Sequence, residues 1–155
     1  MVSNESYSPV AITPSVFIDV MRNLITTCTP NPIAATKVFG EMLGSLYAYK
    51  HGLEIFLIRI GHATPTPSDF RDLAMWISPR DLAQLVSIGI DHPNVHFEIV
   101  YGVSGNTRSW YDNSNAQRLG YRPLDNAESY AAAVLTQKGS VTERHYQGGS
   151  YTQID

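Results

Sequence analysis

The chain has 155 residues, 43% of them apolar, which is enough for one domain with a buried core. A formal net charge of −3, without any Lys/Arg run, argues against a nucleic-acid-binding surface and against attachment to an anionic membrane. Cys28 is the single cysteine, so an intramolecular disulfide and a cysteine-based metal site are excluded, and a reduced thiol favours the cytoplasm.

Three further features are not expected from the sequence: a signal peptide, a membrane-spanning segment and a metal site. The first residues lack a basic region followed by an unbroken apolar core, so we expect no signal peptide. No stretch approaches the roughly 20 apolar residues of a membrane span. The histidines are scattered without ligand spacing, so we expect no metal site.

The N-terminal third is predicted to form two helices after an irregular start. Residues 1–14 are dominated by Ser, Asn, Pro and Thr, which favour a loop or the remnant of a strand. Apolar spacing within 16–27 predicts a short helix. Pro32 suits the first turn of a helix and Gly52 suits its end, so a second helix is predicted from residue 32 to about residue 50.

The second predicted helix carries the most information. An apolar stripe on it is expected to pack on a sheet. The stripe consists of Phe39, Met42, Leu43 and Leu46. Ile33 and Lys37 are four residues apart and therefore share a face, and we expect Lys37 to lie at the edge of a cleft. Gly40 and Gly44 continue roughly that face, where a neighbouring element can approach closely.

Two apolar runs in the remainder predict strands. The run over 54–60 is nearly continuous and rich in β-branched residues, as in a strand buried on both faces of a parallel sheet. A second strand is predicted over 95–103, and a loop over 61–68. Ser78 is expected to cap a helix that has Pro79 in its first turn. Helices are predicted over 78–90, 113–119 and 127–135, and a polar tail over 138–155.

This order of elements predicts an α/β fold with right-handed crossovers between parallel strands. We expect residues 1–155 to form a single domain. Two clear strands are few for an open parallel sheet, so the sheet is expected to be incomplete. Unpaired strand edges and exposed apolar faces promote association, and we therefore expect a homo-oligomer, a homodimer or a multiple of it.

A series of motifs resembles one enzyme family. Residues 30–37 resemble the signature Pro-x-x-Tyr-x-x-x-Lys of the extended short-chain dehydrogenase/reductases, also called the NAD-dependent epimerase/dehydratase family. Further motifs narrow the resemblance to the NAD-dependent uronate dehydrogenases. They lie at 58–61, 64–67, 70–71, 75–76, 100–107, 109–113, 119–123 and 146–149. The match covers about residues 30–149 and corresponds to the C-terminal, substrate-side part of such an enzyme.

The resemblance implies a partial Rossmann-like parallel sheet with flanking helices, lacking the N-terminal glycine-rich nucleotide-binding half. It also implies oxidation of galacturonate or glucuronate to the aldarolactone, with NAD as the hydride acceptor. In this family a tyrosinate is the base. A lysine, here Lys37, lowers the pKa of that tyrosine by its charge and holds the nicotinamide ribose.

The resemblance extends to the substrate site. Arg71 matches an arginine that grips the substrate carboxylate, a role that suits the guanidinium fork. His62 occupies the loop position of a substrate-contacting serine. Ser3 and Asn4 align weakly with a Ser-Asn pair, which implies a catalytic role for Ser3 and a substrate contact for Asn4.

Two departures from the family pattern change the expected activity. The tyrosine position holds Ile33, which can neither donate nor accept a proton. The glycine-rich turn that seats the pyrophosphate is absent, because residues 102–105 follow a strand but do not open a helix. We therefore expect the isolated chain to be inactive and to lack an NAD site, unless a separate chain supplies the nucleotide half and a replacement proton-transfer group. The alternative is a non-catalytic module that binds an acidic sugar or only assembles.

The candidate residues also have plain structural interpretations. Lys37, taken alone, is typical of a solvated helix lysine. Arg71 pairs equally well with Asp69 or Asp72. His62 is favoured as an ordinary loop histidine over a base. Packing and interface contacts are favoured over a sugar platform for three aromatic residues, which are Trp76, Trp110 and Tyr111.

Overall fold

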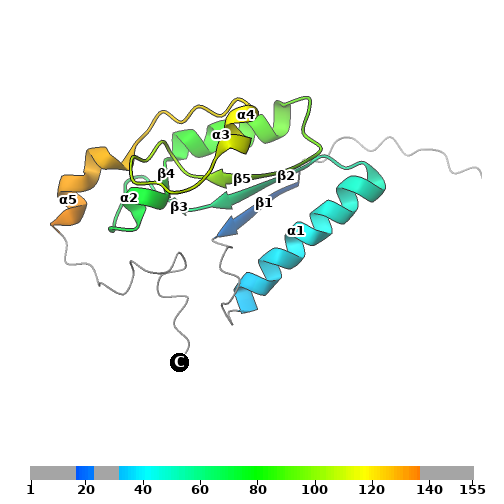
Figure 1. The fold of residues 1–155 in the computed structure, drawn as a ribbon, viewed down its shortest axis with the longest axis horizontal. Helices are drawn as coiled ribbons and strands as arrows, with labels where there is room; N and C mark the ends of the chain where they lie inside the picture. Colours follow the sequence, from blue (N-terminus) through cyan, green and yellow to red (C-terminus); the bar gives the residue numbers. More distant parts are fainter. Residues whose placement is uncertain (1–16, 23–31, 137–155) are drawn as a thin grey trace, which may run out of the picture.

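The computed structural model describes residues 17–22 and 32–136, which form a parallel sheet with helices on both faces (Figure 1). The three-stranded sheet has the order β1-β2-β5, and a second, two-stranded sheet pairs β3 with β4. The strands are β1 (Phe17–Arg22), β2 (Ile55–Ile60), β3 (His62–Ala63), β4 (Trp76–Ile77) and β5 (Phe97–Gly102). The helices are α1 (Pro32–His51), α2 (Asp72–Met75), α3 (Pro79–Asp91), α4 (Ser114–Arg118), the 3₁₀ helix η1 (Ala127–Tyr130) and α5 (Ala131–Leu135). The predicted α/β fold is therefore confirmed.

Strand β2 is the centre of the sheet, and its two faces are buried against different helices. Ile55 and Leu57 pack with Ala48 of α1 on one side. Phe56 points to the other side, where it packs in the same cluster as Leu85 of α3. Successive side chains of a strand alternate between faces, so a sheet covered on both faces needs an apolar residue at nearly every position. Both faces of β2 are covered within the chain.

Residues 17–22 form an edge strand, so the helix predicted over 16–27 is wrong. β1 pairs parallel with β2 in a register that joins Phe17 to Ile55 and Arg22 to Ile60. The segment is rich in aromatic and β-branched residues, which suit a strand, and pairing with a distant segment outweighs the local helical spacing. Within the described residues, β1 pairs with β2 alone.

Helix α1 forms where predicted, but its apolar stripe does not face the sheet. The stripe residues are exposed to different degrees: Phe39 67%, Met42 67%, Leu43 40% and Leu46 53%. Small residues make the contact with the sheet instead. Ala48 is fully buried, and a Cβ added at Gly44 would lie 3.2 Å from Cγ2 of Ile55. The helix lies close to the sheet on this small-residue face, which turns the stripe outward.

One partly buried ion pair fixes α1 to the sheet. The carboxylate of Glu41 accepts hydrogen bonds from Nε and Nη2 of Arg59 on β2, at 2.7 and 2.9 Å. Such a two-bond pair fixes direction as well as distance. Helix α1 ends at Gly52, whose φ of +68° is the left-handed conformation that glycine adopts without strain. None of the described helices is long and apolar enough to cross a membrane.

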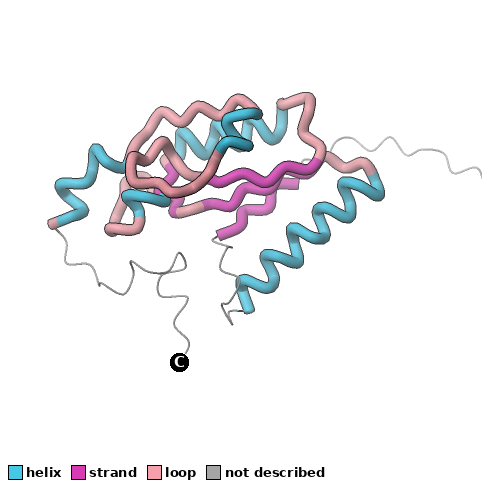
Figure 2. The backbone as a smooth tube through the Cα atoms, viewed as in Figure 1, coloured by secondary structure: helices cyan, strands magenta, loops and turns pink. Residues whose placement is uncertain are grey.

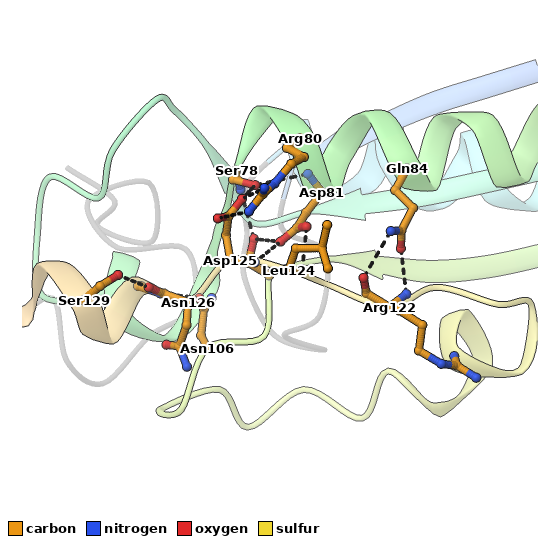
Figure 3. Close-up of polar contacts among 12 residues, drawn as sticks. Ser78, Arg80, Asp81, Gln84, Asn106, Arg122, Leu124, Asp125, Asn126 and Ser129 are labelled. Atoms are coloured by element: carbon orange, nitrogen blue, oxygen red, sulfur yellow. Dashed lines mark hydrogen bonds and ion pairs between the residues drawn. The ribbon is translucent and has the colours of Figure 1, made fainter.

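A group of polar side chains centred on a buried carboxylate joins α3 to two distant segments (Figure 3). This Asp81 cluster consists of Ser78, Arg80, Asp81, Ser104 and Asp125. Asp81 has no exposed surface, and its carboxylate accepts from the Ser104 hydroxyl at 2.6 Å and from the backbone N–H groups of Leu124 and Asp125 at 2.8 and 3.1 Å. Ser78 caps α3 as predicted, because its hydroxyl accepts from the Asp81 N–H at 3.1 Å.

Ser78 and Arg80, two other members of the Asp81 cluster, bind the carboxylate of Asp125. Its carboxylate accepts from the Ser78 hydroxyl at 2.6 Å and from Nη2 of Arg80 at 2.6 Å. The Ser78 hydrogen bond and then the Arg80 guanidinium lower the pKa of Asp125. Burial, followed by the negative charges of Asp81 and Asp125, raises the pKa of Tyr121. Tyr121 thus stays neutral and donates to the carbonyl of Val103 at 2.8 Å.

Replacement of Asp81 by Asn should destabilise the fold. An amide has one accepting oxygen, so at least one of the three donors that face Asp81 would meet an NH₂ group. We expect a loss of about 1–3 kcal/mol in the free energy of unfolding, measured by urea denaturation. Asp91→Asn, at the exposed end of α3, is the matched control and should change the value by less than about 0.5 kcal/mol. Equal stabilities of the two variants would contradict the structural role of the cluster.

Candidate functional site

The segment after β2 bends back on itself and brings His62 next to Asp72. His62 of β3 stands in register with Trp76 of β4. A Cβ added at Gly61 would lie 1.9 Å from the carbonyl oxygen of Met75, so only glycine permits this close return. Nδ1 of His62 lies 2.6 Å from Oδ1 of Asp72. Helix α2 lies at the end of the sheet toward which the strand arrows point (Figure 1), and loops predominate there (Figure 2).

The carboxylate of Asp72 organises this loop. Asp72 is only 1% exposed. Besides His62, its carboxylate accepts from the N–H of Ser68 at 2.7 Å, the hydroxyl of Ser68 at 3.0 Å and the N–H of Asp69 at 3.4 Å. A buried carboxylate is tolerated when donors surround it, and here they tie the loop that precedes α2 to the first residue of that helix.

Arg71 lies at the start of α2, half-buried, next to Asp72 in the chain. Its Nη2 lies 3.4 Å from the sulfur of Met75, one turn further along α2. Oδ1 of the neighbouring Asp69 accepts from the Asp72 N–H at 3.0 Å. Arg71 and His62 thus lie on one loop, with His62 bound to Asp72 and Arg71 next to Asp72 in the chain.

Trp76 holds the loop on the body of the domain. It is 2% exposed, its indole N–H donates to the carbonyl of Thr64 at 2.8 Å, and its ring meets Tyr130 edge-on. The packing interpretation of Trp76 is therefore confirmed. Trp110, by contrast, is 64% exposed and stacks on Tyr111.

The other candidate residues lie elsewhere or outside the described ranges. Lys37 is half-buried on α1, one turn before the Glu41 carboxylate that pairs with Arg59. Ile33 lies one turn earlier on the same helix. Ser3 and Asn4 lie outside the described residues. No group of three or more potential metal ligands occurs in the described part of the chain.

Sequence reasoning missed the role of Asp72. It considered this residue only as a partner for Arg71, because nothing local signals that a chain reversal brings residue 62 to residue 72. The short α2 and β4 that create the reversal also lie below the length at which apolar periodicity is informative. Chemically, the loop offers one guanidinium for an anion and one oriented imidazole for a polar group.

No family model matches the chain, but comparison with known proteins finds uronate dehydrogenases together with a glucose-6-phosphate dehydrogenase and an L-arabinose 1-dehydrogenase of Haloferax volcanii. The uronate dehydrogenase of Pseudomonas putida is 40% identical over 119 residues, which are 75% of this chain and 44% of that enzyme. The structure of a glucuronic acid dehydrogenase from Chromohalobacter salexigens superposes with a TM-score of 0.81 at 30% identity, covering 90% of this chain and 59% of that one. The uronate dehydrogenase of Agrobacterium tumefaciens superposes with a TM-score of 0.77 at 30% identity over 86% of this chain and 52% of that one, in a tyrosine-to-alanine mutant complexed with NAD.

These similarities extend over most of this chain but only part of each relative. The chain spans less than half the length of the curated uronate dehydrogenases that it matches, at 44%, 43% and 36% of theirs. The chain is therefore a relative of the uronate dehydrogenases, and it corresponds to a part of those Rossmann-like enzymes.

Proposed function

We propose that this chain is the C-terminal, substrate-side part of a uronate dehydrogenase-type oxidoreductase, and that it binds a carboxylated sugar through Arg71 and His62. The observation that supports the proposal is the position of these two residues on one loop, with His62 bound to the Asp72 carboxylate and Arg71 at the start of α2. The names of the relatives indicate uronates as the class of ligand. A guanidinium makes two parallel charge-assisted bonds with such a carboxylate. Residues 1–155 are proposed as one domain acting in the cytoplasm, with 138–155 as a polar tail.

The described residues fit a nicotinamide cofactor only in part. Lys37 is available on α1 to contact a ribose. The turn after β5 does not form a phosphate cradle, because it leads into the Asp81 cluster and not into a helix N-terminus. The hydroxyl of Ser104 in that turn is buried and bound to Asp81. We propose that a separate chain supplies the nucleotide-binding half, next to the edge of β1 for which the described residues offer no further strand.

The isolated chain should show no uronate dehydrogenase activity. Loss of the proton-transferring tyrosine alone costs roughly 10²–10⁴ in rate, and loss of the pyrophosphate-binding turn removes the cofactor site as well. NADH formation from galacturonate is the measurement, with the Pseudomonas putida enzyme assayed in parallel. Ile33→Tyr should not restore activity. NADH formation above the buffer rate by this chain alone would overturn the expectation.

Glucuronate, but not glucose, should shift the NMR signals of residues 61–76. The carboxylate distinguishes the two sugars, and Arg71 is the group that recognises it. Arg71→Lys loses the guanidinium fork and should weaken glucuronate binding by about tenfold. Arg118→Lys, on exposed α4, is the matched control and should bind as the wild type does. Equal or absent shifts with both sugars would exclude this site.

Assembly is a second candidate function, supported by the outward face of α1. This face carries the four stripe residues, and Tyr49 of the same helix is 71% exposed. Apolar surface of this extent on one helix favours a protein partner. We propose that the partner is a second copy of the chain, because a twofold interface lets one apolar face bury itself. An assembly module without catalysis is the alternative to the split enzyme.

Sedimentation at micromolar concentration should show a dimer or a multiple of it. Phe39→Ser combined with Met42→Ser should shift the protein to the monomer, because both side chains belong to the proposed contact. Trp110→Ser removes an equally exposed aromatic residue away from α1 and should leave the oligomer intact. A wild-type monomer would contradict the proposed assembly.

A further inference from the structure

We infer that Asp72 is a positioning residue for His62: its buried carboxylate holds the imidazole in the Nδ1–H form and presents Nε2 to the bound sugar as a hydrogen-bond acceptor. The inference rests on the acidic-sugar site proposed above. It gives Asp72 the role of orienting His62, and it makes Nδ1 of His62 a hydrogen-bond donor and Nε2 an acceptor. The pair joins β3 to the start of α2 across the chain reversal, at an Nδ1–Oδ1 distance of 2.6 Å.

The surroundings of Asp72 determine which nitrogen carries the proton. Backbone N–H groups cannot accept hydrogen bonds, and two of them, from Ser68 and Asp69, point at Oδ2 of Asp72. The Ser68 hydroxyl donates to the same oxygen at 3.0 Å. A carboxylic acid gives up its proton more readily than an imidazolium does, so the carboxylate is the acceptor at Oδ1 as well. The bond between Asp72 and His62 therefore requires the proton on Nδ1, and the neutral ring then has its lone pair on Nε2.

The exposure of the pair shows which edge of the ring is open. The side chain of Asp72 is 2% exposed, whereas that of His62 is 31% exposed. Nδ1 faces the buried carboxylate, so the exposed part of the imidazole lies on the opposite edge, which carries Nε2. In the described part of the chain, Nδ1 is the ring nitrogen of His62 that makes a hydrogen bond. The structure thus leaves Nε2 available to a ligand.

This polarity complements the chemistry of a uronate. Such a sugar carries one carboxylate, which matches Arg71, and several hydroxyl groups, each of which can donate a hydrogen bond. An acceptor at fixed Nε2 selects a hydroxyl and rejects a second anionic oxygen. A serine hydroxyl donates or accepts and makes no such choice. His62 held by Asp72 therefore orients the sugar, while Arg71 anchors its charge.

The tautomer of His62 is measured directly by ¹⁵N NMR of the imidazole in the whole chain, without ligand. The spectra are recorded at increasing pH until the ring ¹⁵N shifts no longer change, and the tautomer is then assigned. We expect the Nδ1–H form in the wild type. In Asp72→Asn the amide oxygen can take the Ser68 and Asp69 donors, which turns the NH₂ group toward His62. Nδ1 must then accept, so we expect the Nε2–H form.

Glucuronate affinity is measured on the same proteins by NMR titration. We expect Asp72→Asn to weaken binding about five- to tenfold, because Nε2 of His62 is protonated in this variant and can no longer accept a hydrogen bond from a sugar hydroxyl. His62→Asn places an amide NH₂ where Nδ1 donates to Asp72 but has no atom at Nε2. It should keep the melting temperature and lose affinity to a similar extent. Asp91→Asn, at the exposed end of α3, is the control and should change neither tautomer nor affinity.

Several outcomes would overturn the inference. An Nε2–H tautomer in the wild type overturns it however well the variants fold. Wild-type affinity in both Asp72→Asn and His62→Asn overturns it while the acidic-sugar site survives. Absence of glucuronate binding by the wild type overturns both proposals together, so failure of this inference and failure of the site are distinguishable.

Discussion

The buried carboxylate of Asp81 is the constraint on which the arrangement of the sheet's C-terminal end depends. A carboxylate without exposure is costly unless donors surround it, and here donors come from the loop after β5 and from the segment before η1. These segments lie more than 20 residues from Asp81 in the chain. If either segment moved away, the buried carboxylate would lose hydrogen-bond donors, which is costly in an apolar interior. No described buried side-chain polar atom lacks a partner, which is consistent with a rigid junction.

The candidate site is attached to this junction through Trp76. The carbonyl of Trp76 accepts from the N–H of Ser104 at 2.9 Å and from the side-chain amide of Asn106 at 2.8 Å. Its indole N–H reaches back to the loop that carries His62. Asp72 has the same role within that loop as Asp81 has in the domain. Its buried carboxylate binds donors from separate positions of the chain, among them His62 and Ser68. Rigid support of this kind is what a binding residue such as Arg71 needs in order to hold one geometry.

The opposite side of the domain is organised by close packing of small residues. Gly44 and Ala48 let α1 approach β2, and the Glu41–Arg59 pair fixes its rotation. The larger apolar residues of α1 are consequently directed outward. This exposed face and the outer edge of β1 are the two surfaces whose partners the described residues do not supply. They agree with a chain that matches only a part of each relative's length.

The sequence by itself determined the elements whose signals are local. The apolar run of β2 and the serine cap of α3 each appear within a few neighbouring residues, and the short motifs were sufficient to identify the relatives. Local spacing failed for β1, because its strand conformation comes from pairing with β2, more than 30 residues later in the chain. It also failed for the orientation of α1. Periodicity finds an apolar stripe, but the contact distance allowed by Gly44 and Ala48 decided which face meets the sheet. The pairing of His62 with Asp72 likewise required the chain reversal, since only the folded backbone brings these two side chains within hydrogen-bonding distance.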